Sequence, residues 1–262
     1  SYFLILMLTA VVLIGRRLLL GPLIATVMIL TQEKFLSMGG YADKIILGSV
    51  LIVTLALFPK GLVGFAGPLR RLLRTLGHDA HGWGQGRNVG PRGDTLQQAL
   101  QRIEDLHRSS GRKLSLVGWS LGGLYARELA KQAPHAVRAV VTLGSPFAGP
   151  MQANNAWRTY QWVHRHRPPE PPSRAELQTP PPVPTTSIYS RSDGVVAWPC
   201  SLQVAGPMSE SIEVAASHLG LGVNPLALYA LADRLAQPEG QWRAFDRSGL
   251  RATVYPANAS RA

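Results

Sequence analysis

The spacing of apolar and polar residues divides the chain near residue 65. Before this point, almost uninterrupted apolar runs cover residues 2–14, 18–30 and 45–58. Each run is 13 or 14 residues long, whereas a membrane-spanning helix needs about 20. The pattern therefore predicts no clean transmembrane span. Three alternatives remain: a region lying on a membrane, an oligomerisation surface, or a segment folded into the following domain.

Beyond residue 65, apolar strands alternate with amphipathic helices. Asp94 and Asn224 are the predicted N-caps of two helices, and Pro134 ends a third. This alternation is typical of an α/β protein with a mostly parallel central sheet and helices on both faces. The predicted strands cover 79–83, 113–119, 137–143, 185–190 and 211–216, and the predicted helices cover 69–76, 95–109, 121–133 and 225–236.

The segment 149–184 interrupts this alternation. It is rich in proline and contains Trp157, Tyr160 and Trp162. It is too long for a plain connection, and insertions of this length often form lids or binding loops. A disordered linker is the alternative, but the aromatic cluster favours a packed cap. We therefore expect these three aromatic residues, together with Trp119, to contact the substrate.

Composition and charge limit the kinds of partner that the chain is expected to bind. It is 46% hydrophobic and carries a net charge of +12. A basic surface attracts anionic lipid or nucleic acid, but no nucleic-acid-binding motif is present, so we expect no nucleic-acid partner. Cys200 is the single cysteine, and it is predicted to be a buried structural thiol with no intrachain disulfide. No histidine pair has the setting of a metal site, so neither metal nor cofactor is expected.

The sequence Gly118-Trp119-Ser120-Leu121-Gly122 fits the nucleophile-elbow pattern Gly-x-Ser-x-Gly. An apolar strand precedes it and a helix follows it, which is the structural setting that this motif requires. Glycine is expected two residues on either side of the serine, because side chains there would collide with neighbouring elements. The pattern predicts Ser120 as a nucleophile at the N-terminus of a helix.

A serine hydroxyl needs a base, and the order expected in this fold is serine, acid, histidine. Asp193 follows a predicted strand, where catalytic groups gather in open α/β sheets, whereas Asp233 lies inside a helix. His218 is the only histidine downstream of Asp193. The sequence therefore predicts Asp193 as the acid and His218 as the base.

The oxyanion formed during ester cleavage needs two backbone N–H donors. Leu121, the residue after the nucleophile, is predicted to supply one. The second should come from a loop that follows an earlier strand, and the apolar stretch 51–58 is the available candidate. We therefore expect Gly61 or Leu62 to supply the second donor.

These motifs resemble those of α/β-hydrolase esterases and lipases over about residues 65–262. The resemblance rests on Gly-Trp-Ser-Leu-Gly-Gly at 118–123, Ser-Asp-Gly at 192–194 and Ser-His at 217–218. It implies an eight-stranded sheet, a variable cap at about 149–184, no metal, and hydrolysis of carboxylic esters, with lipases and phospholipases included.

The first 64 residues carry a second resemblance. Gly21-Pro22, Gly39-Gly40-Tyr41 and 58–64 (Phe-Pro-Lys-Gly-Leu-Val-Gly) look like the C-terminal end of a branched-chain amino-acid ABC transporter permease. This resemblance implies a fusion, in which residues 51–62 supply a strand to the hydrolase sheet.

The combined expectation is a serine esterase or lipase with an ester or lipid substrate. We also expect membrane or detergent contact and self-association through residues 1–64. The localisation favoured is a membrane-associated or cytoplasmic bacterial-type protein. The alternatives are an acyltransferase or amide hydrolase on the same triad, and a non-catalytic membrane-associated fusion protein.

Overall fold

The computed structural model describes residues 66–86, 94–149 and 174–257. The chain divides into two compact units, Ser1–Ala80 and His81–Ala262. Helix α4 (Ala66–Thr75) belongs to the first unit and confirms the basic amphipathic helix predicted over 69–76. Within that unit, the Arg74 guanidinium donates two hydrogen bonds to the Ala80 carbonyl oxygen, at 2.9 and 3.2 Å. The apolar runs at 2–14, 18–30 and 45–58 lie outside the described residues.

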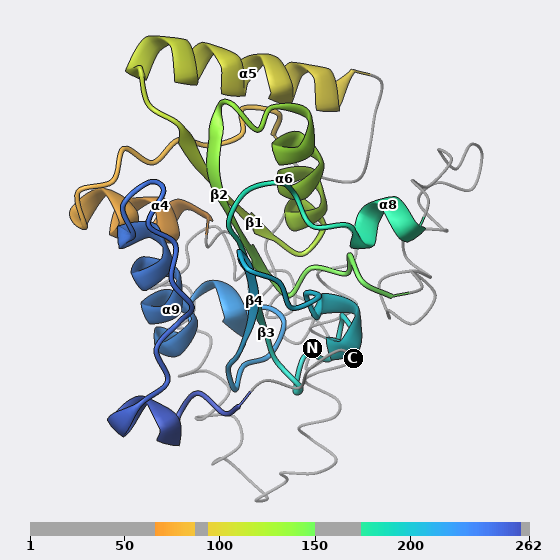
Figure 1. The fold of residues 1–262 in the computed structure, drawn as a ribbon, viewed down its shortest axis with the longest axis vertical. Coiled ribbons are helices and arrows are strands. Elements are labelled where there is room, and N and C mark those ends of the chain that lie inside the picture. The colour runs from red at the N-terminus through yellow and green to blue at the C-terminus, as the bar shows by residue number, and fades with distance from the viewer. Residues whose placement is uncertain (1–65, 87–93, 150–173, 258–262) are drawn as a thin grey trace, which may run out of the picture. The chain divides into compact units, whose positions relative to one another are not determined.

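Four parallel strands form the sheet of the second unit, in the order β1-β2-β3-β4 (Figure 1). They confirm the predicted parallel sheet and account for four of the eight strands that the resemblance implies. Because every strand runs in the same direction, their carboxyl ends meet at one edge of the sheet, where α/β proteins place their sites. The strands are β1 (Leu114–Trp119), β2 (Val137–Leu143), β3 (Thr185–Tyr189) and β4 (Ser209–Glu213).

Helices cover the sheet on two sides. Helix α6 packs against β1 and β2, α5 packs on α6, and α9 packs against β3. Figure 1 shows α6 and α9 on opposite sides of the sheet. The remaining helices are short. The bounds are α5 (Thr95–Ser110), α6 (Leu121–Gln132), α8 (Arg174–Gln178), η3 (Trp198–Ser201), η4 (Gly220–Gly222), α9 (Pro225–Ala236) and η5 (Gly249–Thr253).

The main apolar cluster joins α5, α6 and β2. Burying one aliphatic side chain of this kind contributes roughly 1.5–3 kcal/mol, so the cluster holds the helix that begins after Ser120 firmly against the sheet. Cys200 is buried, as predicted. Buried members of the cluster include Ala99, Ile103, Tyr125, Leu129, Ala130, Val137 and Val140.

The two predicted helix caps differ in outcome. The Asn224 side-chain oxygen accepts hydrogen bonds from the backbone N–H groups of Leu226 and Ala227, at 2.9 and 3.1 Å, which confirms this cap. Asp94 stands at the N-cap position, as predicted, but its side chain makes no capping hydrogen bond to the helix. Its backbone (φ −92°, ψ 16°) is outside the extended region that aims a capping side chain at the helix amides. Its carboxylate instead accepts from the Gln98 side chain at 2.6 Å.

The strand predicted over 79–83 is also wrong, because this segment forms irregular backbone. Glycines follow it closely, and Gly84 has φ +84°, a conformation that a strand does not use. The indole N–H of Trp83 closes a local turn by donating to the Gly86 carbonyl oxygen at 2.7 Å. The Arg102 guanidinium donates a hydrogen bond to the Gly82 carbonyl oxygen at 2.9 Å.

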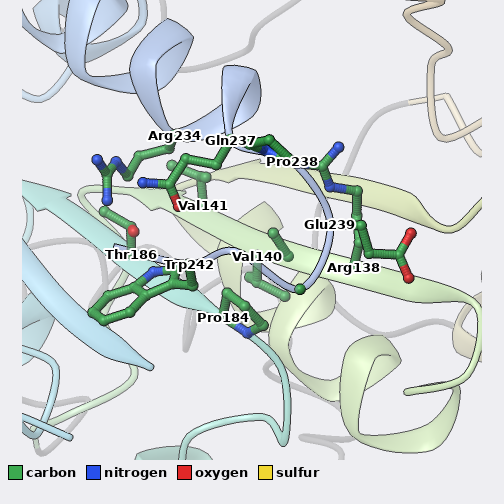
Figure 2. A pocket seen from close by; sticks show the side chains of 12 residues that line it. Arg138, Val140, Val141, Pro184, Thr186, Arg234, Gln237, Pro238, Glu239 and Trp242 are labelled. Atoms are coloured by element: carbon green, nitrogen blue, oxygen red, sulfur yellow. The ribbon is translucent and has the colours of Figure 1, made fainter. Parts of the chain in front are cut away.

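A small cavity lies at the amino-terminal edge of the sheet (Figure 2). Its lining includes Arg138 at the start of β2, Pro184 before β3 and Trp242 beyond α9. Its volume is about 20 Å³, which is room for a single water molecule. This cavity is therefore too small for an ester substrate.

No helix in the described ranges is both long enough and apolar enough to cross a bilayer.

Candidate active site

Ser120 occupies the turn between β1 and α6. Its backbone has φ 53° and ψ −126°, and it is the one non-glycine residue with positive φ in the described part of the chain. A non-glycine residue held in such a region costs about 1–3 kcal/mol. The Ser120 N–H donates to the Leu143 carbonyl oxygen at 2.8 Å, so the neighbouring strand fixes the turn. This strained strand-to-helix turn is the geometry that the motif predicts.

The glycines around Ser120 have different roles. A Cβ built on Gly118 would lie 2.5 Å from the backbone nitrogen of Gly123, and a Cβ on Gly123 would overlap the Ser145 side chain. A Cβ on Gly122 would meet no atom within 4 Å. The steric need for glycine is therefore confirmed at Gly118 and is wrong at Gly122. On the helix side, Gly123 is the residue that requires it.

Asp193 and His218 form a buried pair. The Asp193 Oδ2 atom lies 2.7 Å from Nδ1 of His218, and their side chains are 2% and 6% exposed. The other carboxylate oxygen, Oδ1, accepts hydrogen bonds from the backbone N–H groups of Val195 and Val196, both at 2.8 Å. An ionised carboxylate can only accept hydrogen bonds, so the proton of the imidazole is assigned to Nδ1. Nε2 then has a free lone pair and can accept a proton.

Trp119 connects this pair to β1, the strand that precedes Ser120. Its indole N–H donates to the His218 carbonyl oxygen at 3.1 Å. The indole and imidazole rings lie 5.0 Å apart at an angle of 37°. Ser120 follows Trp119 directly, so its backbone is connected to the loop that carries His218. Among the described residues, no hydrogen bond joins the Ser120 hydroxyl to the His218 ring.

The end of β2 completes the site. Gly144 follows this strand with φ 53°. A Cβ at this position would lie 2.9 Å from Oδ2 of Asp193 and 3.3 Å from Nδ1 of His218. The carboxyl ends of all four strands therefore contribute: Ser120 follows β1, Gly144 follows β2, and the Asp193 and His218 loops follow β3 and β4. Sequence reasoning missed Gly144, and its place directly after a buried strand was the available signal.

Two serines join the loop of Asp193 to the loop of His218, a role that the sequence did not predict for either. The buried Ser190 Oγ accepts hydrogen bonds from the backbone N–H groups of Ser192 and Ala216, at 3.2 and 3.1 Å. The Ser192 hydroxyl donates to the Ala216 carbonyl oxygen at 3.1 Å. The Ser-x-Ser spacing just before Asp193 was the only sequence signal, and it does not reveal the partner on the other loop.

Arg127, on the buried face of α6, is a further residue that the sequence did not single out. Its guanidinium lies 3.9 Å from the centre of the Phe147 ring. It donates to the carbonyl oxygens of Leu177, Gln178 and Thr179 at the end of α8, at 3.1 to 3.3 Å. Burial lowers the pKa of this guanidinium to about 10. Arg127 thus fixes segments on either side of residues 150–173 to the helix that starts directly after Ser120.

The predicted oxyanion donors differ in what the structure describes. Leu121 is the first residue of α6, where backbone N–H groups lack an intrahelical acceptor and the helix dipole favours negative charge. Gly61 and Leu62 lie outside the described residues, as does the stretch 51–58. The predicted cap residues Trp157, Tyr160 and Trp162 also lie outside them. The described residues contain no cluster of three or more histidine, cysteine or acidic side chains that could bind a metal.

Comparisons with known proteins agree with the architecture. A family model described as "alpha/beta hydrolase fold" matches residues 80–167, and no curated protein matches the sequence. Similar solved structures include Aspergillus fumigatus lipase B, at 17% identity and a TM-score of 0.49, covering 66% of this chain and 49% of the other. The chain thus spans about half the length of that lipase.

Two further structures are similar at comparable levels. Paleococcus ferrophilus monoacylglycerol lipase has 16% identity and a TM-score of 0.43, with 65% of this chain and 88% of the other covered. A pyrethroid hydrolase from Sphingobium faniae has 17% identity and a TM-score of 0.44, with 66% and 92% covered. The sheet, the strained serine turn and the family match together show that this chain has an α/β-hydrolase fold.

Proposed function

We propose that this protein is a serine hydrolase that cleaves carboxylic esters through an acyl-enzyme on Ser120. The observation that carries the proposal is the buried Asp193–His218 pair at 2.7 Å, found at the same sheet edge as the strained serine turn. Burial matters because a water-excluded carboxylate orients the imidazole and stabilises the charge that the ring acquires during the reaction.

The proposed reaction has two halves. Nε2 of His218 takes the proton of the Ser120 hydroxyl while the oxygen attacks the ester carbonyl carbon, which gives a tetrahedral oxyanion. Collapse of this intermediate breaks the carbon–oxygen bond of the ester, and the histidine returns the proton to the departing alcohol. Water then attacks the acyl-enzyme with the same base, which releases the carboxylic acid and restores Ser120. The serine–histidine hydrogen bond commonly tightens only when substrate binds.

The oxyanion requires donors that are fixed before the reaction. We assign one to the Leu121 N–H, since it opens α6 directly after the nucleophile. We assign the second to the backbone of Gly61 or Leu62. Losing one donor of this kind costs about 10²–10³ in turnover, so a chain lacking the segment around residues 61–62 should retain weak activity rather than none.

The direct test is hydrolysis of p-nitrophenyl esters over a range of acyl lengths by wild type and Ser120→Ala. Ser248→Ala, at an exposed serine outside the site, is the matched control. We expect Ser120→Ala to lose activity and labelling by a fluorophosphonate probe, while the control keeps both. Undiminished hydrolysis by Ser120→Ala would refute the assignment. The acyl-length profile, extended to phospholipid substrates, separates esterase from lipase or phospholipase.

The same triad supports two related reactions, acyl transfer and amide hydrolysis. Both begin with acylation of Ser120, so probe labelling does not distinguish them from ester hydrolysis. Product analysis with an added alcohol or amine acceptor does: a predominant new ester or amide would assign acyl transfer. Absence of labelling in wild type would favour the remaining alternative, a non-catalytic fusion protein.

We also propose that residues 1–64 derive from the end of a transporter permease and give the protein its contact with membranes or with a second copy. The support is the set of three apolar runs and the glycine-rich motifs at 21–22, 39–41 and 58–64. The test is flotation of the full chain with anionic vesicles, alongside light scattering in detergent for self-association. Full-chain monomers that stay with the unbound fraction would contradict this proposal.

A further inference from the structure

Trp119 makes two separate contacts with His218, although the residues are far apart in sequence. The first is the hydrogen bond from its indole N–H to the His218 carbonyl oxygen, at 3.1 Å. The second is the ring contact, with centroids 5.0 Å apart at 37°. One contact holds the backbone of the histidine loop, and the other holds the imidazole itself. Both come from the residue that immediately precedes Ser120.

These contacts supply constraints that the carboxylate alone does not. The hydrogen bond between Asp193 and Nδ1 fixes one atom of the imidazole ring. The ring remains free to tilt about that bond, and such a tilt moves Nε2, the atom that must reach the serine hydroxyl. A flat indole packed against the imidazole restricts the tilt. The bond to the carbonyl oxygen restricts the backbone from which the ring projects.

The position of Trp119 directly before Ser120 connects its contacts with His218 to the nucleophile. Its peptide group is shared with Ser120, whose backbone is itself bonded to the end of β2. The loop that carries His218 is therefore held in a fixed position relative to the end of β1, where the nucleophile lies. We infer that Trp119 is a positioning residue that sets the direction of Nε2 of His218 toward Ser120, rather than a side chain that selects the acyl group. This inference rests on the proposed function.

The test compares two substitutions at Trp119 with the same substitution elsewhere. Trp119→Phe keeps an aromatic ring and removes the N–H donor, and Trp119→Leu removes both. Trp83→Phe is the matched control. The Trp83 indole also donates to a backbone carbonyl oxygen, that of Gly86, and it also packs on an aromatic ring, that of Tyr125. Neither contact of Trp83 involves His218.

We expect kcat for p-nitrophenyl esters to fall by about 10- to 100-fold in Trp119→Leu, because small misplacements of a reacting group have effects of this size. Trp119→Phe should recover part of that loss. KM should change by less than about threefold, and the loss in kcat should be the same for short and long acyl chains, since the ring acts through the base. The rate of fluorophosphonate labelling should fall in parallel, and Trp83→Phe should match wild type.

Two results would overturn the inference. Unchanged kcat in Trp119→Leu would mean that His218 needs no support from the indole. A loss that appears in KM and varies with acyl length would return Trp119 to the role of a substrate contact. In both cases Ser120→Ala would still be inactive, so the proposed function would stand while this inference failed.

A second readout tests the inference without ester hydrolysis. The proton on Nδ1 of His218, bonded to Asp193, should give a downfield proton NMR resonance in wild type. We expect this resonance to broaden by exchange in Trp119→Leu and to persist in Trp83→Phe. A resonance equally sharp in all three proteins would overturn the inference, even if wild type proved inactive toward every ester.

Discussion

Gly144 and Asp193 approach so closely that no side chain fits between them. A Cβ on Gly144 would lie 2.9 Å from Oδ2 of Asp193, the oxygen that bonds to His218. The end of β2 thus lies directly against the Asp193–His218 pair. The absence of a side chain at residue 144 is therefore a condition for the pair to form.

Gly144→Ala should displace the carboxylate and reduce kcat/KM by about 10²-fold, because a misplaced catalytic group loses activity on this scale. Gly249→Ala is the matched control. Gly249 has a similar positive φ of 60°, but a Cβ there meets no atom within 4 Å. Alanine at positive φ destabilises the backbone in both variants. If both have the same thermal midpoint and only Gly144→Ala loses activity, the loss is due to the steric contact with the site. Equal activities would contradict it.

Asp193→Asn should lower kcat by about 10³–10⁴-fold while leaving the fold intact. The reason lies in the two backbone N–H groups of Val195 and Val196, which both point at Oδ1. They would hold the carbonyl oxygen of an asparagine in that place, so its NH₂ group would face Nδ1 of His218. The ring would then carry its proton on Nε2, the wrong atom for a base. Steady-state kinetics with Asp105→Asn, at an exposed carboxylate, as the control would check this, and a loss of less than about tenfold would argue against Asp193 as the acid.

Ser190→Ala should weaken both stability and turnover. Removing the hydroxyl leaves the N–H groups of Ser192 and Ala216 without their acceptor, which costs about 1–3 kcal/mol in the free energy of unfolding. It also loosens the joint between the loops of Asp193 and His218, so kcat should fall.

Ser187→Ala separates these two effects. Ser187 is also buried on β3, but its hydroxyl donates to the Ser201 carbonyl oxygen, away from the joint between the two loops. Urea unfolding should show both variants destabilised, and kcat should fall only for Ser190→Ala. A similar kcat in the two variants would mean that the serine joint has no part in positioning the pair.

Arg127→Lys should destabilise the protein by about 1.5–3 kcal/mol, since a lysine cannot reproduce the several directed bonds that the guanidinium makes. Arg127 donates to carbonyl oxygens at the end of α8 and to the Gln203 side chain at 2.5 Å. Arg108→Lys, at an exposed arginine, should leave the urea midpoint unchanged. If the two substitutions had the same effect, the buried guanidinium would not be anchoring α8.

Much of the fold could be predicted because it depends on neighbours in the sequence. The strand Val137–Leu143 and the helix Pro225–Ala236 have the predicted bounds, since an apolar run and an Asn-Pro cap act within a few residues. The turn at Ser120 was also predictable, because the close approach of Gly118 to the backbone of Gly122 and Gly123 lies within six residues of sequence. The strand predicted over 79–83 failed for the opposite reason: its backbone depends on a hydrogen bond from the distant Arg102 side chain, and a glycine at positive φ follows it.

The sequence by itself determined the order of chemical groups, with Ser120, Asp193 and His218 each following a strand. The tertiary structure alone decided how closely those groups meet and which residues hold them. The place of Gly144 after a buried strand marks the edge of the sheet, but nothing local identifies His218 as the neighbour of Trp119 and Gly144. That contact depends on the register of parallel strands joined by long connections. Periodicity and turn chemistry act over a few residues, whereas the meeting of four strand ends is a property of the assembled sheet.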